Sequence, residues 1–142
     1  MKKIFLFLDK VEVAFVQEEK AEALIKAEIC EDKSKIHSFS LRFKNPFESP
    51  ETSREFGKLC AELGFEMDCC KAFDLAYPSA SSASKELKAA IEAGAVKSVK
   101  VLASGIYSQW RYWTHWAGTK IDEDGILWFK VAMERLAELT ED

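Results

Sequence analysis

His37-Ser38-Phe39-Ser40-Leu41-Arg42-Phe43 places ring or aliphatic side chains at every second position, with hydroxyl or charged side chains between them. A period of two is typical of a β-strand with one buried face. Asn45-Pro46 follows, and proline ends a strand because it has no N–H group to donate to a neighbouring strand. The pattern therefore predicts a strand over residues 37–43, around which the other elements are arranged.

A helix is predicted directly after this strand. Thr52 and Glu55 have the T-x-x-E spacing of a capping box, in which each side chain binds the backbone N–H of the other residue. Apolar side chains then recur at helical spacing, at Phe56, Leu59, Cys60 and Leu63. Gly64 is expected to end the helix, since glycine takes the left-handed conformation there at little cost.

The rest of the chain continues to alternate between strand and helix patterns. Further strands are predicted over residues 65–71 and 96–103. Three further helices are predicted: one begins at Ser82 or Ser84 and ends at Gly94, and the others cover residues 104–117 and 125–139. This alternation implies right-handed crossovers and a largely parallel sheet.

The N-terminal third has the pattern of a hairpin followed by a helix. Residues 3–8 and 11–15 predict two strands joined at Asp9-Lys10, and residues 18–30 are rich in helix formers. An all-strand meander over the same region is the alternative. The complete expectation is an α/β or α+β fold, with a single globular domain over residues 1–142. Its sheet is a single mixed layer of about five strands, flanked by about five helices.

The composition is that of a globular protein. The 142 residues are 48% hydrophobic and 31% charged, and the net charge is −4. This acidic balance argues against nucleic acid as a partner. The apolar run at residues 4–8 is shorter than a signal peptide or a membrane span requires, so we expect a cytoplasmic protein without membrane contact. Cys30, Cys60, Cys69 and Cys70 are then expected to be reduced thiols.

The segment over residues 106–116 contains three tryptophans at intervals of three. On a helix, Ile106, Trp110 and Trp113 share one face, which predicts a contact with the core. A stacking platform for a sugar or a base is the alternative interpretation. The opposite face carries polar and aromatic side chains that are candidates for binding, namely Ser108, Arg111, Tyr112 and His115.

Residues 93–121 contain no acidic side chain. Ser104-Gly105 lies within this window at a predicted strand-to-helix junction, where free backbone N–H groups and the helix dipole favour an anion. The predicted site for an anionic small molecule is formed by Lys100, Ser104, Gly105, Arg111, Tyr112 and His115. The alternative is that a buried strand and a tryptophan-rich helix leave little room for carboxylates.

Signals for catalysis and for metal binding are weak. His37 and His115 are the only histidines, and neither has a second ligand at helical spacing. A catalytic Cys–His pair is conceivable, but the sequence lacks the G-x-S-x-G and G-x-G-x-x-G motifs. We therefore expect no metal and no cofactor, nominate no catalytic residue, and favour a protein that is not an enzyme.

The last predicted helix has two apolar side chains outside its main stripe. The stripe runs through Ile126, Phe129, Met133 and Leu136, whereas Leu127 and Val131 lie beside it. Such a pair is expected to contact a second copy or another protein, unless the helix is buried on two sides. The sequence thus favours a non-catalytic binding or protein-interaction domain. The alternative is a small enzyme or anionic-ligand-binding domain with its pocket at Ser104-Gly105.

Overall fold

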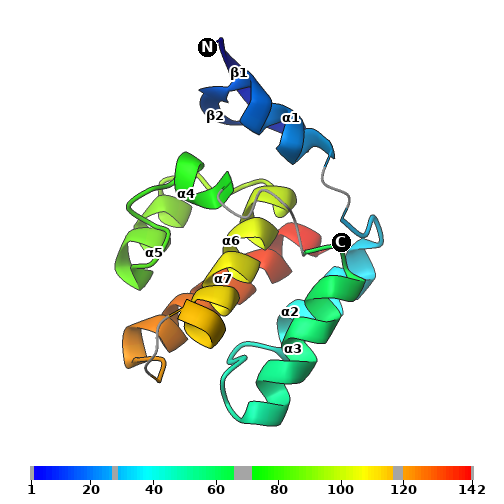
Figure 1. Cartoon of the computed structure of the whole chain (residues 1–142), viewed down its shortest axis with the longest axis vertical. Coiled ribbons are helices and arrows are strands. Elements are labelled where there is room, and N and C mark those ends of the chain that lie inside the picture. Colours follow the sequence, from blue (N-terminus) through cyan, green and yellow to red (C-terminus); the bar gives the residue numbers. More distant parts are fainter. Residues whose placement is uncertain (1, 27–28, 66–71, 117–119, 142) are drawn as a thin grey trace.

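The computed structural model describes residues 2–26, 29–65, 72–116 and 120–141 (Figure 1). Two strands, β1 (Lys3–Leu8) and β2 (Val11–Gln17), open the fold. The helices that follow are α1 (Glu18–Lys26), α2 (Lys33–Arg42), α3 (Pro50–Glu62), α4 (Ala72–Ala76), α5 (Ser84–Glu92), α6 (Val99–Arg111), the π-helical turn η1 (Tyr112–Trp116) and α7 (Glu123–Thr140).

The mixed α/β class and the N-terminal hairpin are confirmed, but the five-stranded sheet is wrong. Within the described residues, the only sheet is the antiparallel pair β1–β2. Residues 37–43 lie in α2 and at its C-terminal end, and residues 99–103 form the first turns of α6. The strand predicted over residues 65–71 falls almost entirely outside the described residues, as do Cys69 and Cys70.

Residues 37–42 form a helix because the apolar side chains that reach the core lie three or four residues apart, counting from Ile36. This spacing matches the 3.6 residues of a helical turn. Ile36, Phe39 and Phe43 are buried, whereas Leu41 is 52% exposed. Asp32 caps this helix by accepting a hydrogen bond from the Ser34 N–H at 3.0 Å. The Ser34 hydroxyl also donates to this carboxylate, and it lowers the pKa of Asp32.

Residues 99–103 form a helix for a different reason. Ser98 caps α6, accepting a hydrogen bond from the Val101 N–H at 3.3 Å. Residues 101–107 are all buried, so the first half of α6 is enclosed on every side. A short apolar run has no periodicity to separate a buried strand from a buried helix. The predicted strand-to-helix junction at Ser104 therefore does not form.

The helix predicted after Thr52 is confirmed, with its cap moved upstream. Ser49 is the N-cap residue, and its hydroxyl oxygen accepts a hydrogen bond from the Thr52 N–H at 3.1 Å. Pro50 occupies the first helical turn, where its missing N–H costs nothing. Gly64 follows the helix with φ of 76°, the left-handed conformation expected there.

The hairpin has one buried and one exposed face. Leu6, Leu8 and Val16 are buried, whereas Phe5, Phe7 and Phe15 are each more than half exposed. Asp9 and Lys10 both have positive φ, as a two-residue hairpin turn requires. The Ser98 hydroxyl donates to the Asp9 carboxylate at 3.3 Å and so joins this turn to the start of α6.

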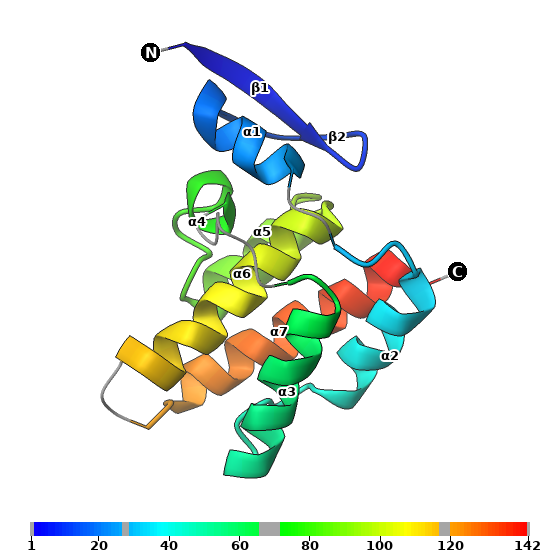
Figure 2. The ribbon, with the colours of Figure 1, turned by 45° about the vertical axis from the view of Figure 1, so that its right-hand side comes forward.

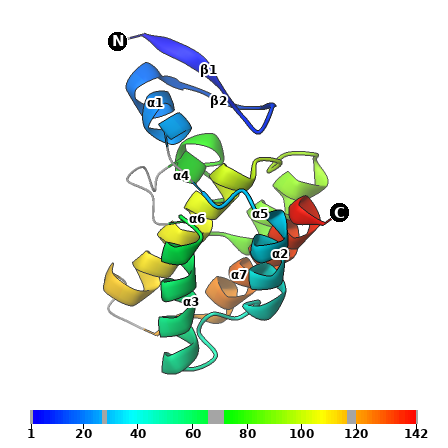
Figure 3. The ribbon, with the colours of Figure 1, turned by 90° about the vertical axis from the view of Figure 1, so that its right-hand side faces the viewer.

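Helix α7 lies at the centre of the helical part and contacts α2, α5 and α6. Figures 2 and 3 show the hairpin and α1 together at one end of the molecule, next to α4. The core is largely aromatic: the Phe56 ring lies 5.1 Å from that of Phe39 and 6.2 Å from that of Phe129. Of the helices described here, none is both long and apolar enough to cross a membrane.

Candidate functional site

The six residues predicted to bind an anion do not come together. Lys100 lies in the first turn of α6, and Arg111 is the last residue of that helix. A rise of 1.5 Å per residue separates their backbones by about 16 Å along the axis. Tyr112 and His115 lie beyond Arg111 in η1, and all three are exposed. One compact ligand therefore cannot contact both Lys100 and this group.

Ser104 and Gly105 are buried in the middle of α6, away from any ligand. A Cβ atom built on Gly105 would lie 2.6–2.8 Å from atoms of Phe73, including the Phe73 Cβ. Contacts this short do not occur between folded side chains. The absence of a side chain at Gly105 thus allows α4 and α6 to pack closely. The space beside Gly105 is filled by Phe73 and cannot hold a phosphate.

Trp110 of α6 and Trp113 of η1 contact the core, as the first interpretation of that helix predicts. Trp110 and Trp113 are half-buried and pack against it. The Trp110 indole N–H donates to the Ser53 hydroxyl at 3.1 Å, which fixes this ring against α3. Arg111, Tyr112 and His115 line neither of the two cavities described below.

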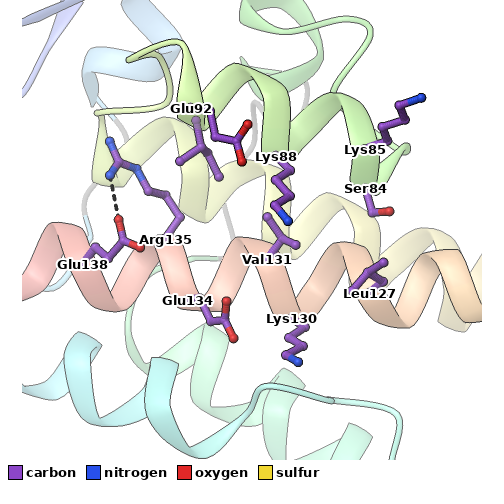
Figure 4. A pocket seen from close by; sticks show the side chains of 11 residues that line it. Ser84, Lys85, Lys88, Glu92, Leu127, Lys130, Val131, Glu134, Arg135 and Glu138 are labelled. Atoms are coloured by element: carbon purple, nitrogen blue, oxygen red, sulfur yellow. Dashed lines mark hydrogen bonds and ion pairs between the residues drawn. The ribbon is translucent and has the colours of Figure 1, made fainter.

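A groove of about 570 Å³ lies between α5 and α7, and we call it the α5–α7 groove (Figure 4). Its apolar lining comes from Ile91, Leu127 and Val131. Leu127 is 47% exposed and Val131 is half-buried. The two side chains that lie beside the main stripe of the last helix are therefore adjacent in one surface depression.

The groove exists because each helix buries a different face. In α7, Trp128, Phe129 and Leu136 are buried, which leaves Leu127 and Val131 on a separate side of that helix. In α5, Leu87 is buried, whereas Lys85 and Lys88 are exposed and line the groove. That α5 lines a site was not predicted from the sequence. The sequence does contain a signal for its exposed face, since Lys85, Lys88 and Glu92 follow the helical spacing i, i+3 and i+7.

Hydrogen bonds hold both ends of the α5–α7 groove. The backbone N–H and hydroxyl of Ser84, at the start of α5, donate to the carboxylate of Asp124 in the first turn of α7. At the other end, Arg135 Nε donates to the Val96 carbonyl at 2.9 Å, and its Nη1 contacts Glu138 Oε2 at 2.9 Å. The two walls are thus fixed relative to each other.

Charges along the groove are sorted by sign (Figure 4). Lys85, Lys88 and Lys130 form its basic end, and Glu92, Glu134 and Glu138 form its acidic end, where Arg135 also lies, paired with Glu138. Among the described residues, the sole ion pair between groove side chains joins Arg135 to Glu138. The three lysines are therefore available to an external partner.

A second cavity, of about 810 Å³, lies between the hairpin turn and the start of α6. Lys33, Lys97 and Lys100 line it together with two carboxylates, those of Asp9 and Glu31. Lys100 is the one member of the predicted anion site that this cavity contains. We call it the lysine cavity.

The described residues contain no group of three or more metal-ligating side chains. Cys30 is half-buried and Cys60 is buried. The α5–α7 groove offers an apolar strip bordered by charges, and the lysine cavity offers three ammonium groups beside two carboxylates. Comparison with protein-family models, curated proteins and solved structures finds no match for this chain.

Proposed function

We propose that this chain is a single globular domain of the cytoplasm that binds another protein, without catalysis, through the α5–α7 groove. The partner is another protein or a second copy of the chain, and it contributes a helix or another narrow apolar ridge. A free thiol at Cys30 is compatible with a reducing compartment.

The observation that carries the proposal is the exposure of Leu127 within an apolar strip bordered by charge. Leu127 is 47% exposed although it lies next to the half-buried Val131. Protein interfaces commonly combine such an apolar centre with a polar rim. Burial of a whole leucine side chain contributes about 1.5–3 kcal/mol, so the exposed half of Leu127 offers a partner about 1 kcal/mol. Helix-in-groove recognition uses anchors of this kind.

Leu127→Lys is expected to abolish association through the groove. The substitution removes the exposed apolar anchor and replaces it with an ammonium group, whose desolvation on association is costly. Association is measured by sedimentation of the purified chain and by amine-reactive cross-linking in the host cell, followed by mass spectrometry of cross-links from Lys88 and Lys130. Both the associated species and these cross-links are expected to disappear.

Leu41→Lys is the matched control. Leu41 is 52% exposed on α2 and lies outside the α5–α7 groove. This variant is expected to associate as the unmodified chain does. If Leu127→Lys retains every association and every cross-link, the groove is not the binding surface and the proposal is wrong.

The lysine cavity supports a second candidate function, the binding of an anionic small molecule. Three ammonium groups favour an anion with several oxygens, such as a phosphate. In a calorimetric titration with inorganic phosphate, Lys97→Ala combined with Lys100→Ala is expected to weaken binding at least tenfold, a ratio equivalent to about 1.4 kcal/mol. Lys44→Ala combined with Lys58→Ala, outside the cavity, should change nothing. Equal affinities for both double variants would contradict this function.

A further inference from the structure

The α5–α7 groove has a direction. In Figure 4 both helices run the same way, from Ser84 and Leu127 at one end to Glu92 and Glu138 at the other. The basic end of the groove therefore coincides with the N-terminal ends of both helices, and the acidic end with their C-terminal ends. The helix dipoles add to this sorting at Lys85, Glu92 and Glu138, which lie in the first or last turns of their helices.

We infer that the partner in the groove is the same groove of a second copy, related by a two-fold axis that reverses the direction of its helices. This inference rests on the proposed function and names its partner. A two-fold axis brings one surface against itself, so the surface must complement its own reversed image. Here the reversal places the three lysines of each copy opposite the acidic end of the other, where Glu92 and Glu134 have no ion-pair partner among the described residues and Glu138 is paired with Arg135.

The opposite arrangement is excluded by the same charges. Two copies with parallel helices would place Lys85, Lys88 and Lys130 against the same lysines, and Glu92 and Glu134 against the same glutamates. Like charges brought together at an interface oppose association, whereas complementary charges select the partner and its orientation.

The apolar strip lies where the two copies are expected to meet. On α7 the charge changes sign between Lys130 and Glu134, and Val131 lies in this interval. On α5 it changes sign between Lys88 and Glu92, where Ile91 lies. Both apolar side chains line the groove, so two of its three apolar residues lie at the centre of the charge pattern, with Leu127 one turn toward the basic end. This is the arrangement of an apolar seam bordered by ion pairs.

Paired charge reversals test the inference on the full chain. One variant carries Lys88→Glu and Lys130→Glu, and the other carries Glu92→Lys and Glu134→Lys. Neither variant touches the Arg135–Glu138 pair or the Ser84–Asp124 bonds. Sedimentation equilibrium is expected to give a dimer for the unmodified chain and a monomer for each variant alone. An equimolar mixture is expected to recover the dimer, because each groove then meets one of opposite charge.

Salt dependence gives a second measurement that needs no substitution. Ion pairs at the rim are screened, so the dissociation constant of the unmodified dimer is expected to rise at least tenfold from about 50 to about 500 mM NaCl. This readout decides the case if a reversed variant fails to give the circular dichroism spectrum of the folded chain.

Three results would overturn the inference. The first is an unmodified chain that stays monomeric at millimolar concentration; the groove then still serves another protein if Leu127→Lys removes the cross-links described above. The second is a mixture of the two reversed variants that stays monomeric although both are folded. The third is a dimer insensitive to Leu127→Lys, to charge reversal and to salt, which also contradicts the proposed function.

Discussion

Trp128→Ala is expected to lower the free energy of unfolding by about 3–5 kcal/mol, the usual cost of removing a large aromatic side chain from a core. Trp128 is 1% exposed, and its ring lies 5.3 Å from that of Phe129 and 6.0 Å from that of Phe73. Its indole N–H donates to the Ala80 carbonyl at 2.9 Å. Urea unfolding followed by circular dichroism measures the loss, and the melting temperature should fall by roughly 10 °C or more.

Trp128→Phe separates the ring from the hydrogen bond. Phenylalanine keeps most of the apolar volume but leaves the Ala80 carbonyl without its donor, which costs about 1–3 kcal/mol. We expect this variant to be clearly more stable than Trp128→Ala. If both variants unfold like the unmodified chain, Trp128 does not join α7 to the segment before α5, and the described core is wrong at this point.

Gly105→Val is expected to destabilise the protein by about 2–3 kcal/mol through overpacking. The added side chain would occupy the space of Phe73, and the nearest contacts include the Phe73 Cβ, which moves only if α4 moves. Thermal unfolding and near-ultraviolet circular dichroism report this loss. The prediction also separates two roles for Gly105, since a residue at an open ligand junction would accept valine at little cost to stability.

Ala89→Val is the control for the effect of valine in a helix. Ala89 is exposed on α5, so its substitution should cost only the difference in helix propensity, about 0.5 kcal/mol. Equal stability of the two valine variants would mean that Phe73 does not lie against α6.

The sequence predicted the hairpin correctly because its two strands are neighbours in the chain, an apolar run and an alternating segment joined by the short turn at Asp9-Lys10. It failed at residues 37–43 because alternation and helical spacing both fit the same short window. His37, Phe39, Leu41 and Phe43 suggested one face of a strand, yet exposed Leu41 shows that the buried side follows Ile36, Phe39 and Phe43. Counting from Ile36, with Asp32 as the cap, would have favoured the helix.

The sequence predicted one wall of the α5–α7 groove, on α7, and missed the other, on α5. Leu127 and Val131 were found because a single helix displays them, and their position beside the stripe requires no knowledge of other elements. The opposite wall, on α5, depends on which helices meet in space, and one sequence does not contain that information. The predicted anion site failed as a unit because it required a strand where α6 has its first turns.

The connection between the hairpin turn and α6 bears on how the molecule opens. Strands β1 and β2 and helix α1 contact one another, and they meet the other helices at α4 and at the Ser98–Asp9 bond. A hairpin and helix that contact each other at one end of the molecule are suited to open as a cooperative subunit before the whole protein unfolds. Every residue of the α5–α7 groove lies between positions 84 and 138. Such an opening therefore exposes Leu6 and Leu8 to solvent while the binding surface keeps its native form.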